Sequence, residues 1–202
     1  MSADNNPRQS AAPDKARLFF ALWPTPPAAE SLVAIARDVA KTHGGRVTRP
    51  ETVHLTLAFL GEVPLASLPE IKRAAALVAV PAFDITLNRL EFWTRQRLQV
   101  ARCDCPPQLA DLVDQLRRSL AATGLLPARA DYPFKPHVTL VRKMPLAGEA
   151  SGEAAGESEK PPMALPKIDP PVWNCDRFVL ARSRLSPAGS GYELVAAFPL
   201  GG

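Results

Sequence analysis

The spacing of apolar residues predicts alternating strands and helices along the whole chain. Short apolar runs indicate strands, and apolar residues three or four positions apart indicate helices. The run RLFFALW at 17–23 stops at Pro24, and the helical spacing that follows ends before Gly44. The expected elements are a strand at 17–23, a helix at 26–42, a strand at 51–60 closed by Gly61, a helix at 65–80, strands at 83–90 and 98–103, a helix at 107–123, and strands at 137–142, 178–181 and 192–198.

This order of elements predicts an α+β protein with two similar lobes. A strand, a helix and a second strand occur before residue 60, and the same order recurs between residues 98 and 142. We therefore expect two lobes related by a pseudo-two-fold axis. The length from residue 15 to residue 202 is enough for a real core, so we expect these lobes to form a single domain.

Two polar segments fall outside this pattern. Residues 1–14 are polar and lack the apolar stretch of a secretory signal, so they predict a disordered tail. Residues 147–166 are mostly Gly, Ala, Ser, Glu and Pro, which predicts a disordered loop. The acidic part of that loop, 149–160, has a net charge of −3, whereas the whole chain has +4, so the rest carries +7. A positive body suits a polyanionic partner such as RNA.

The cysteines and the hydropathy of the chain limit which kinds of protein it can be. The three cysteines, Cys103, Cys105 and Cys175, are odd in number and have no C-x-x-C spacing, so no disulfide framework is expected. A metal site made by the first two with His43 would have a poor ligand set, and we expect no metal and no cofactor. No run reaches transmembrane length. We expect a cytoplasmic monomer that does not bind membranes.

The motif His-x-Thr-Leu occurs twice in the chain. The copies are HLTL at 54–57 and HVTL at 137–140, and they contain two of the three histidines. In a strand, alternate side chains share a face, so each motif presents one imidazole and one hydroxyl together. A single histidine in a strand is usually structural, but the duplication favours a function. Two such strands side by side would make a groove suited to phosphoryl chemistry on a strained ester.

Two histidines can supply both proton transfers that open a cyclic phosphodiester. The attacking water must lose a proton and the departing ribose oxygen must gain one, so one imidazole must be neutral and the other protonated. An unperturbed imidazole has a pKa of about 6.5 and can adopt both states near neutral pH. The motifs are pseudo-symmetric, and the sequence alone does not say which histidine is the acid.

Four segments together resemble the 2H phosphoesterase superfamily. They are RLFFAL near the start, PETVHLTLAFLGE at 50–62, FKPHVTLVRK at 134–143 and GYELVAAFPL at 191–200. More closely, the chain is similar to the bacterial and archaeal RNA 2′,3′-cyclic phosphodiesterases, also called the 2′-5′ RNA ligase family. The resemblance implies a bilobal fold whose antiparallel sheets line a central groove with helices outside. It also implies metal-independent hydrolysis of RNA terminal 2′,3′-cyclic phosphates to 2′-phosphomonoesters.

The resemblance assigns roles to individual residues. His54 takes the role of proton donor and His137 that of proton acceptor. The hydroxyls of Thr56 and Thr139 are placed to donate to the phosphate oxygens. Arg142 matches the basic position after the second motif, and its guanidinium could bind the phosphate through two hydrogen bonds. By strand alternation, however, Arg142 and His137 would face opposite sides of the sheet, so a bend or the end of the strand must redirect the arginine.

Contacts to the nucleobase and to the RNA backbone are less defined by the sequence. Phe19 and Phe134 are aromatic residues near the groove that could stack on a terminal base, with core packing as the alternative. Four arginines crowd one hairpin and either follow the RNA backbone or form a solvated face. They are Arg89, Arg95, Arg97 and Arg102.

Two other functions remain open at this stage. One is 2′-5′ ligation of tRNA halves, or action on other small cyclic or 2′-5′-linked nucleotides. The other is a non-catalytic module that binds RNA or nucleotides. Binding phosphate requires cations and amides rather than two titrating imidazoles, so the two intact motifs favour an enzyme.

Overall fold

The computed structural model describes residues 14–125, 127, 133–146, 172–186 and 189–201. Its helices are α1 (Pro26–His43), α2 (Leu68–Ala76) and α3 (Pro107–Ala121), with short 3-10 turns at Pro50–Thr52, Leu65–Ser67 and Thr94–Gln96. Its strands are β1 (Lys15–Leu22), β2 (Arg46–Val47), β3 (Leu55–Pro64), β4 (Phe83–Trp93), β5 (Leu98–Cys103), β6 (His137–Arg142), β7 (Val172–Cys175), β8 (Arg177–Ser186) and β9 (Gly189–Pro199). The predicted tail and acidic loop lie outside the described residues, apart from Asp14.

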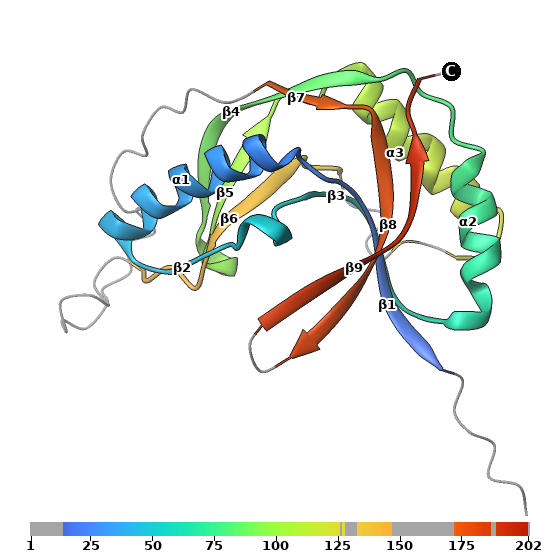
Figure 1. Ribbon diagram of the computed structural model, residues 1–202, viewed down its shortest axis with the longest axis horizontal. Helices are drawn as coiled ribbons and strands as arrows, with labels where there is room; N and C mark the ends of the chain where they lie inside the picture. Colours follow the sequence, from blue (N-terminus) through green and yellow to red (C-terminus); the bar gives the residue numbers. More distant parts are fainter. Residues whose placement is uncertain (1–13, 126, 128–132, 147–171, 187–188, 202) are drawn as a thin grey trace, which may run out of the picture.

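The strands form one curled antiparallel sheet (Figure 1). The order is β7-β4-β5-β6-β3-β1-β8-β9, with β2 paired to β6. If the sheet is divided between β6 and β3, each half has four strands of this order, β2 is an additional strand on β6, and the two motif strands lie side by side at the centre of the sheet. The segment β1-α1-β3 in one half corresponds to β5-α3-β6 in the other. The predicted α+β class and two related lobes are confirmed.

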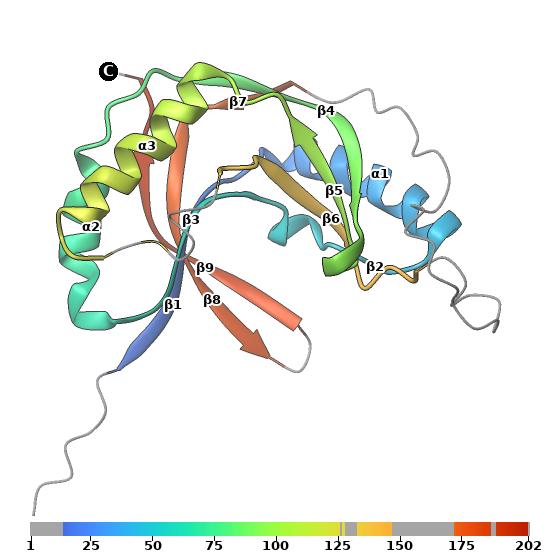
Figure 2. The same ribbon diagram turned by 180° about the vertical axis from the view of Figure 1, so that it is seen from behind.

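Each lobe covers the motif strand of the other lobe with its helix. α1 packs against β6, and α3 packs against β3 and α2. The apolar stripes of both helices are fully buried, through residues such as Leu32 and Ala36 in α1 and Leu112 and Leu116 in α3. Figure 2 shows α2 and α3 beside the half that carries β1, β8 and β9, whereas α1 lies on the half with β6. This exchange ties the two motif strands into one core.

Several expected boundaries differ from the observed ones, and three of these concern the first motif strand and α2. His54 precedes β3 instead of lying within it. β3 passes through Gly61, which was expected to close the strand, because this glycine has a φ of 75° at a β-bulge opposite β1. α2 is much shorter than the predicted helix. Two strands, β2 and β7, were not predicted at all.

No described helix is long and apolar enough to cross a membrane.

Gly45→Ala is expected to destabilise the protein strongly. Gly45 has a φ of 99°, and a β-carbon there would lie 2.6 Å from Val141 Cγ1 and 3.1 Å from the carbonyl oxygen of Arg142. The left-handed backbone costs an alanine about 1–2 kcal/mol, and overpacking against β6 adds about 1–3 kcal/mol. The free energy of unfolding in denaturant measures the sum. Gly124→Ala is the matched control, since its φ is 77° but no heavy atom lies within 4 Å. Equal losses in the two variants would contradict the clash.

Candidate active site

The two motifs meet in one open cavity of about 340 Å³ between the lobes. Six residues singled out in the sequence line it, namely Phe19, His54, Thr56, His137, Thr139 and Arg142. The other lining residues are Arg17, Arg46, Thr52, Phe59, Ser183 and Tyr192. A larger cavity between α2 and α3, of about 600 Å³, contains none of the motif residues. The chemistry predicted from the sequence therefore points to the smaller cavity.

Both imidazoles are fixed in the same way by the backbone. His54 Nδ1 lies 2.8 Å from the carbonyl oxygen of Thr52, and His137 Nδ1 lies 2.7 Å from that of Lys135. A carbonyl oxygen only accepts, so in the neutral ring Nδ1 carries the hydrogen and donates it. This tautomer leaves Nε2 as the ring nitrogen with a free lone pair. Each histidine can thus accept a proton, or donate one once protonated, through Nε2.

Bulges in the motif strands decide which later side chains face the cavity. In the pairing of β5 with β6, Val100 is opposite Thr139 and Gln99 is opposite Val141, so Leu140 is skipped. Leu140 and Val141 are consequently both buried, and the strand parity reverses after them. This reversal brings Arg142 into the cavity lining and is the bend that its predicted role required.

The motif strand of the other lobe has a similar bulge, but it turns a different residue toward the cavity. β1 pairs Phe20 with Ala58 and Ala21 with Thr56, so β3 skips Leu57. Five positions after His54, the lining side chain is Phe59, where the second lobe has Arg142. Arg17 lies over the Phe59 ring, 4.8 Å from its centroid. The site is therefore symmetric at the histidines and threonines and asymmetric beyond them.

Aromatic rings enclose His54. The Trp23 ring is stacked on the imidazole at 5.2 Å between centroids, and Phe19 and Tyr192 lie 5.0 and 5.1 Å away. Phe19 is buried and lines the cavity, so its stacking on a base stays a prediction. Phe134 packs against the main core and is not part of the lining, which gives its predicted stacking no support.

The side chains that line the cavity favour an anionic ligand. Three arginines and two histidines line it, and no carboxylate is present among the described lining residues. Arg46 and Arg142 are directly opposite each other in the β2–β6 pair. Like charges in this position repel, and an anion between them would relieve the repulsion. Arg46 and Arg17 were not predicted as site residues, because neither belongs to a His-x-Thr-Leu motif and each reaches the site through strand pairing.

Both histidines are harder to protonate than a histidine in water. Burial is the main cause for His54 and lowers its pKa to about 4; the hydrogen bond to Thr52 opposes this, and the charges of Arg142 and His137 add to it. Burial also lowers the pKa of His137, and Arg102 and Arg142 act in the same direction. A phosphate ester beside these rings would raise both pKa values, since it brings negative charge.

The curled sheet and the paired motifs define a protein of the phosphoesterase class. A family model described as LigT like Phosphoesterase matches residues 22–100. The chain is 32% identical over 127 residues to the RNA 2′,3′-cyclic phosphodiesterase of Escherichia coli K12. This match covers 62% of this chain and 71% of that protein. It is 30% identical over 199 residues to the RNA 2′,3′-cyclic phosphodiesterase of Thermus thermophilus, over 92% and 91% of the two chains. The chain belongs to the LigT-like phosphoesterase family.

Solved structures agree with this assignment. The crystal structure of E. coli LigT complexed with 3′-AMP matches with a TM-score of 0.78 at 25% identity, over 93% of this chain and 99% of that one. A crystal structure of a Thermus thermophilus protein matches with a TM-score of 0.72 at 26% identity, over 92% of this chain and 98% of that one. The similarity therefore extends over both lobes, whereas the family model ends before the second motif.

Proposed function

We propose that this protein hydrolyses RNA terminal 2′,3′-cyclic phosphodiesters to 2′-phosphomonoesters, with His54 and His137 as the acid and base. The observation that carries the proposal is the matched pair of imidazoles in one cavity, each with Nδ1 bonded to a carbonyl oxygen two residues earlier. The names of the relatives from E. coli and T. thermophilus support the substrate class. The partner is then an RNA or nucleotide with a cyclic phosphate end, and we expect the protein to act on it as a monomer.

The reaction needs two proton transfers on opposite sides of phosphorus. The neutral imidazole, assigned to His137 by the resemblance, takes a proton from water as the water oxygen bonds to phosphorus. The bond from phosphorus to the 3′ oxygen breaks, and protonated His54 gives its proton to that oxygen. The 2′-phosphomonoester and a free 3′ hydroxyl result. Substrate binding is what would protonate His54, since its pKa is about 4 in the protein alone.

The other lining side chains are suited to charge that develops on the phosphate. The threonine hydroxyls of the two motifs can donate to its non-bridging oxygens, and the Arg142 guanidinium can bind two of them at once. These interactions strengthen as the pentacovalent state forms, so they would lower the barrier as well as hold the substrate.

Turnover of a 2′,3′-cyclic nucleotide is expected to persist in excess EDTA and to yield the 2′-phosphate. The described lining residues offer two imidazoles but no carboxylate or thiolate, which is a poor donor set for a catalytic divalent ion. Chromatography against 2′- and 3′-phosphate standards identifies the product. A protein inactive in EDTA and restored by zinc or magnesium would contradict the mechanism, and a 3′-phosphate product would contradict the assigned leaving group.

A further inference from the structure

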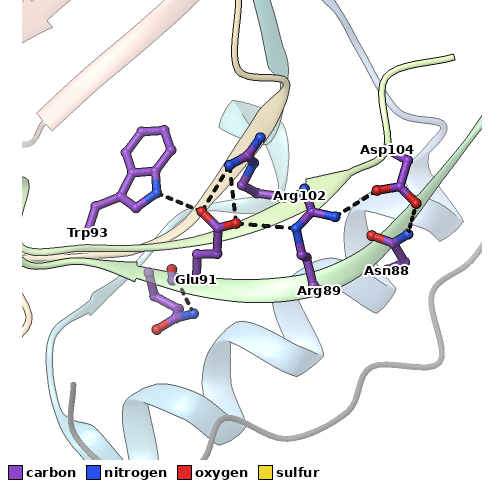
Figure 3. Close-up of polar contacts among 7 residues, drawn as sticks. Asn88, Arg89, Glu91, Trp93, Arg102 and Asp104 are labelled. Carbon is purple, nitrogen blue, oxygen red and sulfur yellow. Dashed lines mark hydrogen bonds and ion pairs between the residues drawn. The ribbon is translucent and has the colours of Figure 1, made fainter. Parts of the chain in front are cut away.

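Side chains of the β4–β5 hairpin form a hydrogen-bonded network (Figure 3). β5 pairs with β6, the strand that begins at His137. The members of the network are Asn88, Arg89, Glu91, Trp93, Arg102 and Asp104. Arg102 Nη1 donates to both Glu91 oxygens at 3.1 Å. Arg89 Nε donates to Glu91 at 3.2 Å and Trp93 Nε1 at 3.1 Å. The Glu91 carboxylate thus accepts hydrogen bonds from two guanidinium groups and an indole.

A bulge in β4 turns this network toward the face of the sheet that carries His137. β5 pairs Cys103 with Leu87 and Arg102 with Arg89, so Asn88 is skipped. Up to Leu87, every second residue of β4 is buried. Beyond the skipped residue the alternation shifts by one, so the residues that continue this series lie on the opposite face of the sheet. Arg102 is in turn directly opposite His137 in the β5–β6 pair. Directly opposed residues share a face, so the three strands present these side chains together.

Two members of the network act on the His137 ring. The Trp93 ring lies 4.5 Å from the imidazole, between centroids. The Arg102 side chain is only 16% exposed, and its Nε has no hydrogen-bond partner among the described residues. A largely buried cation beside an imidazole disfavours the imidazolium unless an anion compensates it. Glu91 is that anion, and it also bonds to the indole that contacts the ring.

We propose that Glu91 is a positioning residue for His137: its carboxylate holds the Trp93 indole against the imidazole and neutralises the Arg102 guanidinium that faces the same ring. The proposal rests on the proposed function, because it gives Glu91 a part in the proton transfer that His137 performs there. It also accounts for two of the four hairpin arginines. Arg89 and Arg102 are engaged with carboxylates of the hairpin, so they are poorly placed to follow an RNA backbone.

Glu91 carries its charge at neutral pH. Burial opposes ionisation of this carboxyl, but the hydrogen bonds from Trp93, Arg102 and Arg89 outweigh it and hold its pKa below the usual range. The other charged or titratable groups around His137 are Arg102 on β5, Arg142 on β6 and, across the cavity, His54. Both arginines disfavour the imidazolium, whereas the charge of Glu91 favours it, as does the hydrogen bond to the Lys135 carbonyl oxygen. Removing Glu91 and removing Arg102 should therefore have opposite effects on the pKa of His137.

The test is an NMR titration of the imidazoles, assigned by replacing each of the three histidines in turn. Glu91→Gln keeps the size and an acceptor oxygen but removes the charge, so the pKa of His137 is expected to fall while that of His54 stays constant. Arg102→Gln is expected to raise the pKa of His137. Trp93→Phe keeps an aromatic ring without the N–H and isolates the hydrogen bond. Glu70→Gln on α2, an exposed carboxylate outside the lining of the cavity that holds the two histidines, is the matched control.

Activity provides the second readout. In Glu91→Gln, kcat for a 2′,3′-cyclic nucleotide is expected to fall by about 10- to 100-fold, because a misplaced base loses alignment, and KM should change far less. Trp93→Phe should fall between this variant and the wild type. A His137 pKa that does not respond to Glu91→Gln and Arg102→Gln in opposite senses would overturn the proposal. If Glu91→Gln does not fold, Arg102→Gln and Trp93→Phe still decide it. An inactive wild type would contradict the proposed function alone, since the titration does not require turnover.

Discussion

Replacing either motif histidine is expected to abolish most of the turnover. His54→Ala or His137→Ala should lower kcat for a 2′,3′-cyclic nucleotide by roughly 10²- to 10⁴-fold, the usual contribution of a general acid or base. Affinity for the 2′-phosphate product should change much less, because the proton transfers occur in the transition state. Steady-state kinetics give kcat, and calorimetry with a 2′-nucleoside monophosphate gives the affinity.

The third histidine is the matched control for this experiment. His43 ends α1 and is not part of the cavity lining, so His43→Ala should retain wild-type turnover. The double variant of His54 and His137 should be less than multiplicatively worse than the single ones, since the pair acts as a unit. Near-normal turnover in a folded His54 or His137 variant would refute the two-histidine mechanism and favour a binding module.

The pH profile of kcat/KM should have its optimum on the acid side of neutrality. This constant reports the protein before substrate binds. There the pKa of His54 is about 4 and that of His137 is below its usual value, and the productive form has one ring protonated. The rate should therefore fall as pH rises above the higher pKa and as it drops below the lower one. The kcat profile should lie at higher pH, because bound phosphate favours imidazolium. A kcat/KM that still rises between about pH 6.5 and 8 would contradict this.

Arg142→Ala is expected to lower kcat/KM by roughly 10²- to 10³-fold, the cost of losing a donor to a developing charge. Unlike the histidine variants, it should also weaken binding of the 2′-phosphate product, since the guanidinium faces charge in both the ground and transition states. Its loss removes a positive charge that lowers the pKa of both histidines, so the pH optimum should move upward. Kinetics across pH and product calorimetry measure these effects.

Two variants separate the geometry of Arg142 from its charge. Arg142→Lys keeps the charge without the planar fork and should recover only part of the activity. Arg46→Ala removes the guanidinium on β2 that lies directly opposite Arg142. Because Arg46 is exposed, this variant should lower kcat/KM less than Arg142→Ala does, and the difference from wild type should vanish at high salt. An Arg46→Ala variant as impaired as Arg142→Ala, or an Arg142→Ala variant with unchanged product affinity, would be inconsistent with the phosphate role.

The elements that the sequence predicted best are those with strong local periodicity. α1 and α3 begin and end within about two residues of the predicted bounds, because the apolar stripe and the flanking proline or glycine are local signals. β2 and β7 have two and four residues and no periodicity of their own. They exist only because a neighbouring strand offers a row of hydrogen-bonding groups, and that neighbour is distant in the sequence.

The fold class and the chemical groups of the site were predictable from the amino-acid sequence, since repeated His-x-Thr motifs and alternating elements can be recognised without knowing what they contact. Which side chains meet depends on how the strands pair in three dimensions. Skipped residues in β6, β3 and β4 turn Arg142, Phe59 and Glu91 toward their functional neighbours, and each skip is visible only in the pairing with another strand. The pleat of a strand fixes alternation locally, but a bulge is a property of two strands.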